Sequence, residues 1–266
     1  MCKSKNWKIT VWGVRGSAPA PFREYMEYGG NTSCICVKRE NHMVVFDAGT
    51  GLTALGNEWS KQEPVRLDII ISHLHIDHVM GLFSFLPFLS ADEINLHGGI
   101  GLEQGLRRML SPPWWPIGIQ DFKAEIHFHE TQPGASFKLG HFTVSTMEGN
   151  HPGGSRLYRL DGDGKSLVYA SDYEFNEEKA ARFSDFAHGS DLLICDANFT
   201  AEDFREGWGH STWEQGLKAV HDAVAKHVLM THYGQGYTDE FLHSQEREAC
   251  KDVRCIFAKE GMEIVL

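Results

Sequence analysis

The sequence predicts an α+β protein with two β-sheets at its core and helices outside. Short strand-like runs outnumber helical runs, and helical runs occur in both halves of the chain. This pattern is compatible with an αββα sandwich, in which each sheet buries one face against the other. The chain has 266 residues, of which 42% are hydrophobic and 16 are phenylalanine, enough for a sizeable core. Because no linker, repeat or low-complexity tract divides it, we expect one domain over residues 1–266.

The predicted elements follow one another along the whole chain. Strand-like runs come first, at 7–12, 33–37, 43–46, 67–71 and 93–96. Helices are predicted from Gly81 into 83–89 and over 102–110. Further strands are predicted at 125–128, 142–145, 156–160, 166–169, 192–195, 228–230, 254–258 and 262–265. The remaining helices are predicted at 177–183, 212–225 and 239–250.

Two local signals mark element boundaries. The stretch Asp161-Gly-Asp-Gly-Lys165 is typical of a hairpin turn, and the closing glutamate that a calcium loop needs is missing. Ser211 and Thr212 precede Trp213-Glu214-Gln215, and a hydroxyl residue followed by an acidic one is a helix-capping signature. We therefore expect a hairpin at the first site and a helix start at the second.

The most informative stretch is Ser72-His73-Leu74-His75-Ile76-Asp77-His78, which directly follows the apolar run 67–71. It places four metal-ligating side chains within six residues. Neutral imidazoles and carboxylates are ligands that zinc, manganese and iron accept. One metal needs only three or four protein ligands, so the cluster is expected to begin two sites. We expect His73 and His75 to serve one, and Asp77 and His78 the other.

A second His-x-His pair, His127 and His129, has a plainer interpretation. Both residues lie on one face of a probable strand, and no Asp-His pair follows at the required offsets. A chain with 15 histidines produces such a pair by chance. We therefore interpret these two as ordinary surface residues.

The His-Leu-His-Ile-Asp-His motif after a buried strand resembles the signature of the metallo-β-lactamase-fold hydrolases. That family adds a third histidine, a bridging aspartate and a last histidine at the ends of later strands. His151, Asp172 and His232 stand in this order, each at the end of a strand-like run or in a turn. The resemblance implies a four-layer αββα sandwich. It also implies that a first metal is held by His73, His75 and His151, a second by Asp77, His78 and His232, and that Asp172 bridges them.

Two more segments extend the resemblance. The stretch 45–51 resembles an acidic loop of the family in which the aspartate, here Asp47, orients a ligand histidine; an ordinary turn aspartate before glycines is the alternative. Asp196 and the Gly-His-Ser-Thr stretch at His210 resemble the phosphodiesterase branch that includes tRNase Z. There the acidic residue pairs with the histidine, which helps to protonate the leaving oxygen. This chain has aspartate where tRNase Z often has glutamate.

The implied chemistry follows from charge. Two divalent ions bring +4, and two carboxylates with a bridging hydroxide return −3, so the pocket keeps roughly +1, which suits a phosphodiester anion. The hydroxide would attack phosphorus, with Asp77, Asp196 and His210 as the residues assigned to catalysis. Zinc is the first choice of metal, with manganese and iron as alternatives.

Composition limits the partners. A net charge of −11 argues against an extended nucleic-acid footprint, which needs clustered lysine and arginine. No segment approaches the roughly 18–20 apolar residues of a membrane span, and the N-terminus lacks the apolar stretch of a secretory signal. Six cysteines without a Cys-x-x-Cys pair favour thiols in a reducing cytoplasm. A homodimer is the default expectation for assembly.

We therefore expect a small phosphodiester substrate such as a cyclic nucleotide. The Pro-x-Lys-x-Arg-Asn motif and the basic arm that tRNase Z uses on tRNA are not recognisable. Three alternatives stay open: tRNA 3′ processing, a non-catalytic metal or nucleotide sensor, and a thioester or lactam hydrolase of the same fold. The last gives the Asp196 and His210 pair no role.

Four other residues allow more than one interpretation. Arg15 and Asn31, in glycine-rich N-terminal loops, either contact substrate phosphate or tie the loops together. Trp114 and Trp115 lie between prolines and cannot both occupy one strand face or a helix interior. They form either a lid that stacks on a base, a subunit contact, or a buried aromatic pair in a stiff loop.

Overall fold

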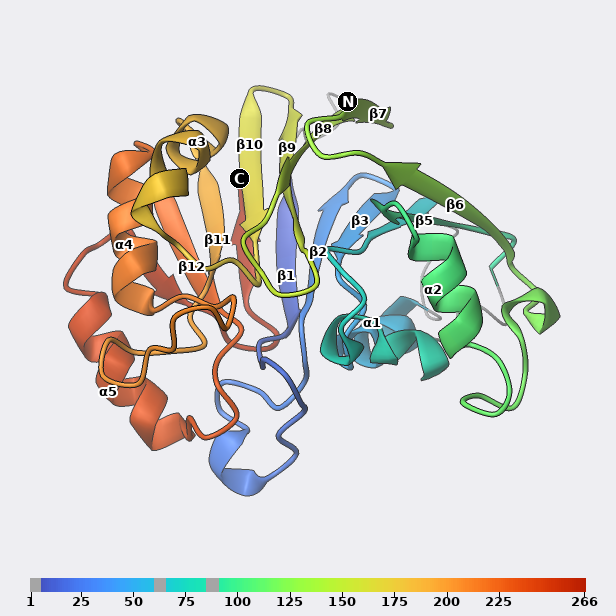
Figure 1. Ribbon diagram of the computed structural model, residues 1–266, viewed down its shortest axis with the longest axis horizontal. Coiled ribbons are helices and arrows are strands. Elements are labelled where there is room, and N and C mark those ends of the chain that lie inside the picture. Colours follow the sequence, from blue (N-terminus) through green and yellow to red (C-terminus); the bar gives the residue numbers. More distant parts are fainter. Residues whose placement is uncertain (1–5, 60–65, 85–90) are drawn as a thin grey trace.

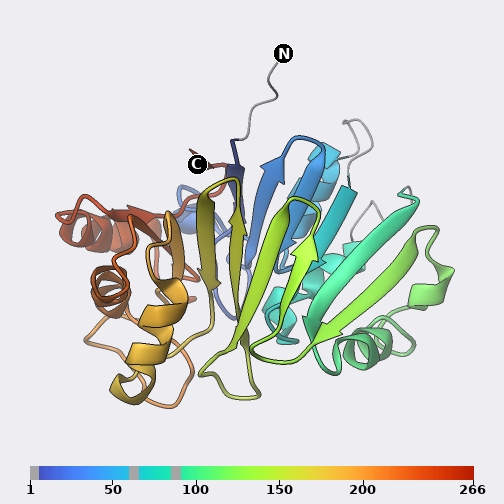
Figure 2. The same cartoon turned by 90° about the horizontal axis from the view of Figure 1, so that it is seen from above.

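Two β-sheets face each other, and helices cover the outer face of each (Figure 1). The computed structural model describes residues 6–59, 66–84 and 91–266. Seen from above, the strands of both sheets occupy the middle of the molecule and the helices lie outside them (Figure 2). The α+β αββα sandwich predicted from the sequence is therefore confirmed.

The first sheet has the strand order β14-β1-β2-β3-β4-β5-β6 within the described residues. Its members are β1 (Lys8–Gly13), β2 (Cys34–Arg39), β3 (His42–Phe46), β4 (Arg66–Ile70), β5 (Glu93–Gly99), β6 (Glu125–Thr131) and β14 (Glu263–Val265). Strands β3 to β6 run parallel to one another. Parallel strands need a crossover, and the helices α1 (Gly51–Trp59) and α2 (Leu102–Met109) lie in two of these connections.

The second sheet has the order β13-β12-β11-β10-β9-β8-β7 within the described residues. Its members are β7 (Ser136–Leu139), β8 (Phe142–Glu148), β9 (Arg156–Gly162), β10 (Lys165–Ala170), β11 (Leu192–Asp196), β12 (His227–Thr231) and β13 (Cys255–Phe257). Strands β10 to β13 are parallel. The helices on its outer side are α3 (Glu177–Ala187), α4 (Trp213–Asp222) and α5 (Asp239–Ala249).

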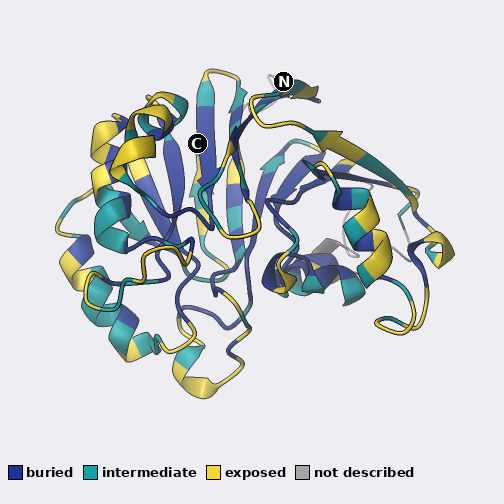
Figure 3. Cartoon of the chain, viewed as in Figure 1, coloured by how far each residue is buried: buried dark blue, intermediate teal, exposed yellow. Residues whose placement is uncertain are grey.

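Alternation along the strands divides the apolar residues between two cores. In β3, Val44 and Phe46 belong to the core between the sheets, whereas Val45 faces the core under α1 and α2. Successive strand side chains point to opposite faces, which produces this division. The central strands are buried and the exposed residues gather on the outer helices and turns (Figure 3).

Strand direction brings several loops to one edge of the sandwich. Strand β8 is antiparallel to β9, which is antiparallel to β10, so β8, β10, β11 and β12 all end at the same edge. In the first sheet, β3 and β4 also run parallel to each other. Loops at the carboxyl ends of strands commonly carry functional residues, and all of the predicted metal ligands follow such strands.

Most predicted elements are found within a few residues of their expected bounds, but helix α1 and strand β7 were missed. Helix α1 contains Gly51, Gly56 and Asn57, which are weak helix formers, and it is stabilised by burial of Leu52 and Leu55 against the first sheet. Strand β7 is a short strand at the edge of the second sheet.

The helix predicted after Gly81 is a 3₁₀ helix over Met80–Ser84, and residues 85–90 of that prediction lie outside the described part of the chain.

The local turn and cap predictions are confirmed. Gly162 pairs with Lys165 across a two-residue turn whose residues, Asp163 and Gly164, have φ of 53° and 75°. Positive φ at both positions is typical of a type I′ hairpin. Thr212 caps α4 and its hydroxyl accepts a hydrogen bond from the backbone amide of Gln215, 3.2 Å away.

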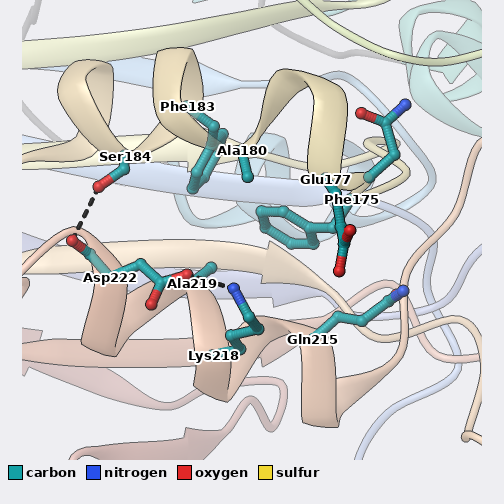
Figure 4. A pocket seen from close by; sticks show the side chains of 10 residues that line it. Phe175, Glu177, Ala180, Phe183, Ser184, Gln215, Lys218, Ala219 and Asp222 are labelled. Atoms are coloured by element: carbon teal, nitrogen blue, oxygen red, sulfur yellow. Dashed lines mark hydrogen bonds and ion pairs between the residues drawn. The ribbon is translucent and has the colours of Figure 1, made fainter.

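Helices α3 and α4 leave an apolar recess between them on the outer side of the second sheet (Figure 4). The ring of Phe175 points into it and packs edge-on against Phe183, with 4.8 Å between ring centroids. At the rim, the Ser184 hydroxyl donates a hydrogen bond to the Asp222 carbonyl oxygen, 2.7 Å away. Phe175 therefore anchors the segment that joins β10 to α3.

The helices of the described residues are short. The longest, α3 and α5, have 11 residues each. Within this part of the chain, no helix combines the length and the apolar content required to cross a bilayer.

Candidate metal centre

The seven predicted metal ligands, which come from four separate segments of the sequence, meet at one edge of the sandwich. Strand β4 delivers the motif whose last residues form a 3₁₀ helix over Ile76–His78. The loops after β8, β10 and β12 deliver the other three residues. Donor atoms in each of two groups lie within 4.8 Å of one another, namely His73, His75, His151 and Asp172 in the first and Asp77, His78 and His232 in the second.

Asp172 lies between the two groups. Its Oδ2 atom is 3.7 Å from Nε2 of His73 and 3.6 Å from Nε2 of His151. Its Oδ1 atom is 3.1 Å from Nε2 of His78 and 3.0 Å from Nε2 of His232. One carboxylate oxygen therefore faces each group, which is the arrangement that a bridging ligand requires.

Asp47 lies behind this cluster and is completely buried. Its Oδ2 is 2.7 Å from Nδ1 of His78, and it also accepts hydrogen bonds from the hydroxyls of Ser72 (2.8 Å) and Tyr169 (2.7 Å). Its Oδ1 accepts a bond from the Ser72 amide at 2.7 Å. A carboxylate on one ring nitrogen fixes the tautomer and directs the other nitrogen of His78 into the centre.

Two other histidines are oriented in the same way. Nδ1 of His151 donates a hydrogen bond to the carbonyl oxygen of Gly209 (2.8 Å), and Nδ1 of His73 is 3.0 Å from the Ser72 hydroxyl. Their Nε2 atoms then point inward. Among the described residues, the Nε2 atoms of His73 and His78 are buried and have no hydrogen-bond partner. Buried nitrogens normally find a partner, so these two fit direct bonds to a cation.

The electrostatics of the centre also fit cations. Burial lowers the pKa of His73 well below its usual value, which keeps its imidazole neutral and able to bind a metal. For His78, burial alone would lower the pKa, but the charges of Asp172 and Asp47 outweigh it and raise the pKa well above its usual value. Burial would raise the pKa of Asp172, but the neighbouring His232 and His78 hold it well below its usual range. The buried carboxylates thus favour positive charge between them.

Three residues of the centre have left-handed backbone conformations. Asp47, Asp172 and His232 have φ of 57°, 51° and 62°, and none is glycine. Such conformations cost free energy in non-glycine residues and cluster at functional sites, where the surrounding structure enforces them. Asp47 and His232 directly follow a strand, and Asp172 lies two residues after the end of β10, so in each case the turn of the backbone directs the side chain towards the centre.

His210 and Asp196 form a pair beside the second group. Nδ1 of His210 is 2.7 Å from Oδ2 of Asp196, and its ring stacks on that of His232 with 5.2 Å between centroids. The same nitrogen is 3.9 Å from Oδ2 of Asp172. Burial would lower the pKa of His210, but the charge and hydrogen bond of Asp196 outweigh it and raise the pKa to about 9. A protonated imidazole held at the rim of a cation site can donate a proton to a bound substrate.

The other sequence candidates have structural contacts. Arg15 is completely buried, and its guanidinium donates hydrogen bonds to three backbone carbonyl oxygens, of Gly29, Tyr237 and Tyr25. Asn31 donates to Glu260 through its backbone and its side chain, at 2.6 and 2.9 Å. Both residues therefore tie loops together.

His127 and His129 lie on β6, outside the donor groups found among the described residues. His129 is instead 2.9 Å from the amide oxygen of Asn95. The two tryptophans differ in burial: Trp115 packs on Phe83, whereas Trp114 is 71% exposed.

Sequence comparison identifies the family. A model described as "Beta-lactamase superfamily domain" matches residues 42–233, which is most of the chain and spans every predicted metal ligand. The chain belongs to the beta-lactamase superfamily. The family, the sandwich fold and the class of enzyme expected from the sequence, a metal-dependent hydrolase, are therefore confirmed.

Several known proteins resemble the chain over nearly its whole length. A ribonuclease Z from Nitrosopumilus maritimus is 23% identical over 307 residues, covering 97% of this chain and 99% of the relative. The crystal structure of the metallo-beta-lactamase fold protein YhfI from Bacillus subtilis has a TM-score of 0.78 at 21% identity and covers 99% and 100% of the two chains. Human tRNase Z, short form, has a TM-score of 0.71 at 20% identity and covers 97% and 98%.

Proposed function

We propose that the protein is a phosphodiesterase with two divalent metal ions. The observation that carries the proposal is the position of Asp172 between two groups of donors, with the His210 and Asp196 pair at their edge. His73, His75 and His151 would hold one ion, Asp77, His78 and His232 the other, and Asp172 both. Zinc suits this set of imidazoles and carboxylates best, and manganese and iron are the alternatives.

The bound ions would supply positive charge for the phosphate and would acidify a water for attack on phosphorus. The residues of the chain orient the ligand histidines and supply the proton. Asp47 and the Gly209 carbonyl hold His78 and His151 in the tautomers that face inward. Asp196 holds His210 and favours its protonated form, so that His210 donates its proton to the leaving oxygen.

A recess beside the predicted metal ligands favours a small substrate that carries a base. It is lined by Ile76, Phe83, Arg108, Met109 and Trp114. Ile76 lies between His75 and Asp77 in the motif and is 52% exposed, so the recess adjoins the centre. An exposed indole and an isoleucine offer a stacking surface for a nucleobase, and the cation of Arg108 suits an adjoining phosphate.

A hydrolysis screen tests the proposal. Purified protein of known metal content would be incubated with cyclic mononucleotides, dinucleotides, bis-p-nitrophenyl phosphate and precursor tRNA. We expect cleavage of the small phosphodiesters that is lost on chelation and restored by zinc. Failure of the zinc-loaded protein to cleave any of these substrates would refute a phosphodiesterase.

Processing of tRNA 3′ ends is the second candidate, because the chain aligns with ribonuclease Z proteins over nearly its whole length. The net charge of −11 disfavours it, since tRNA binding depends on neutralising many phosphates. Tight binding of precursor tRNA that weakens steeply with salt would favour this candidate over the first.

A further inference from the structure

A buried carboxylate two residues after Asp172 has no place in the metal centre described above. Glu174 is 6% exposed. Its Oε1 accepts a hydrogen bond from the Gly207 amide (3.0 Å), and its Oε2 accepts one from the Gly209 amide (2.8 Å). Burying a carboxylate is costly unless its oxygens are hydrogen-bonded, and here both are satisfied by one short loop. Glu174 therefore fixes the loop 207–209 relative to the segment that carries Asp172.

The fixed loop sets the orientation of a predicted metal ligand. The carbonyl oxygen of Gly209 accepts the Nδ1 proton of His151, so the position of this peptide determines where Nε2 of His151 points. The backbone of Gly209 has to come close to the His151 ring to accept this hydrogen bond. A Cβ atom at Gly209 would lie 2.2 Å from Nδ1 of His151 and 2.3 Å from Cδ of Pro152, and the φ of Gly209 is 82°. Only glycine fits there without displacement.

The same loop leads directly into His210. One residue further, the Ser211 hydroxyl donates to the carbonyl oxygen of Tyr173 and accepts a hydrogen bond from the Phe175 amide at 3.1 Å. The segments 172–175 and 207–211 are thus joined at both ends, by Glu174 and by Ser211. Phe175 in turn lies in the recess between α3 and α4 (Figure 4), which secures this pair of segments to the outer helices.

We propose that Glu174 is a positioning residue shared by the ligand His151 and the proton donor His210. Its carboxylate hydrogen-bonds to the amides of Gly207 and Gly209, and it acts on His151 through the backbone of Gly209. This inference rests on the proposed phosphodiesterase function for its His210 part, whereas its His151 part concerns metal binding alone. Outer partners of metal ligands typically contribute about 10–100-fold to metal affinity or activity.

The variant Glu174→Gln tests the inference. Glutamine keeps the size of the side chain, but its NH₂ group would face an amide donor, so one of the two hydrogen bonds is lost. We expect roughly 10–100-fold weaker zinc binding at one of two sites, measured by competition with a chromophoric chelator. We also expect kcat to fall more for an alkoxide leaving group than for p-nitrophenolate. In a His210→Ala background, Glu174→Gln should add little to the loss of kcat.

Asp203→Asn is the matched control. Asp203 also holds this connection through the amide and hydroxyl of Thr200, at 2.7 and 2.9 Å, and its other oxygen accepts a hydrogen bond from Tyr237 and not from Gly209 or His151. It should leave zinc affinity and the leaving-group dependence unchanged. If Glu174→Gln proves unstable, Gly209→Ala displaces the same peptide while keeping the carboxylate, and should give the same pattern.

The outcomes separate the two claims. Zinc affinity equal to that of the unsubstituted protein in both Glu174→Gln and Gly209→Ala would overturn the inference. So would equal losses in Glu174→Gln and Asp203→Asn, because these would indicate a general effect on the loop. If the unsubstituted protein binds zinc but cleaves no phosphodiester, the proposed function fails, and the chelator titration still tests Glu174.

Discussion

Replacing His210 with alanine gives the sharpest test of the proposed chemistry. The ring is held by Asp196 at 2.7 Å and stacks on His232, and its side chain is 12% exposed, so it is fixed in place at the mouth of the centre. General acid catalysis contributes about 10²–10⁴-fold, which corresponds to about 2.7–5.4 kcal/mol of barrier. That benefit applies only where the leaving oxygen needs a proton. We therefore expect a loss of about 10²-fold or more for a dinucleotide, whose leaving group is an alkoxide.

With bis-p-nitrophenyl phosphate the same variant should lose less than about tenfold, because p-nitrophenolate leaves without protonation. The assay compares kcat/KM for the two substrates at saturating zinc, with metal content measured for each preparation. Asp196→Asn is the companion variant and should show the same selectivity with a smaller loss, since the ring remains but its charged partner is gone. Equal losses on both substrates would refute the assignment of His210 as the proton donor.

Four further outcomes are expected. Asp172→Ala should lose most of the two bound ions found by metal analysis, because its oxygens face both donor groups; two tightly held ions in that variant would contradict a bridge. Asp47→Asn keeps the shape of the side chain but should weaken metal binding by about 10–100-fold in a chelator titration. Trp114→Ala should raise KM for nucleotides more than for bis-methyl phosphate esters, and an unchanged ratio would remove Trp114 from base binding. Asp68→Asn should reduce the free energy of unfolding by about 1–3 kcal/mol at pH 7, since His42 and His97 hydrogen-bond to the buried carboxylate. Burial would raise the pKa of Asp68, but these hydrogen bonds hold it below its usual range. The contribution of Asp68 to the free energy of unfolding is therefore complete above about pH 4 and is lost as pH falls through the folded-state pKa. Urea titrations at several pH values would show a difference in stability between the two proteins that shrinks in acid.

The centre was predictable because its residues are chemically distinctive and follow strands. The run from His73 to His78 combines a rare composition with a buried strand before it, and that strand became β4. His151, Asp172 and His232 then had to be found at the ends of later strands. The resemblance to the family picked out these three residues, and parallel strand direction brings the strand ends that carry them together.

Apart from Asp47, the residues that support the centre were not predictable, because they are ordinary in type and distant in sequence. Tyr169 contacts Asp47 across 122 positions of sequence, and Glu174 reaches Gly209 across 35. No local sequence pattern predicts that a tyrosine will donate a hydrogen bond to a buried carboxylate. Helix α1 was missed for a related reason: its stability comes from the burial of Leu52 and Leu55 against the first sheet.

The origin of the donors has a mechanical consequence. His73, His75, Asp77 and His78 belong to one half of the sandwich, whereas His151, Asp172 and His232 belong to the other. Cations bound between them would act as cross-links that clamp the two halves at their shared rim. Loading with metal should therefore slow amide hydrogen exchange in the rim loops of both halves together, while strand centres far from the rim respond little.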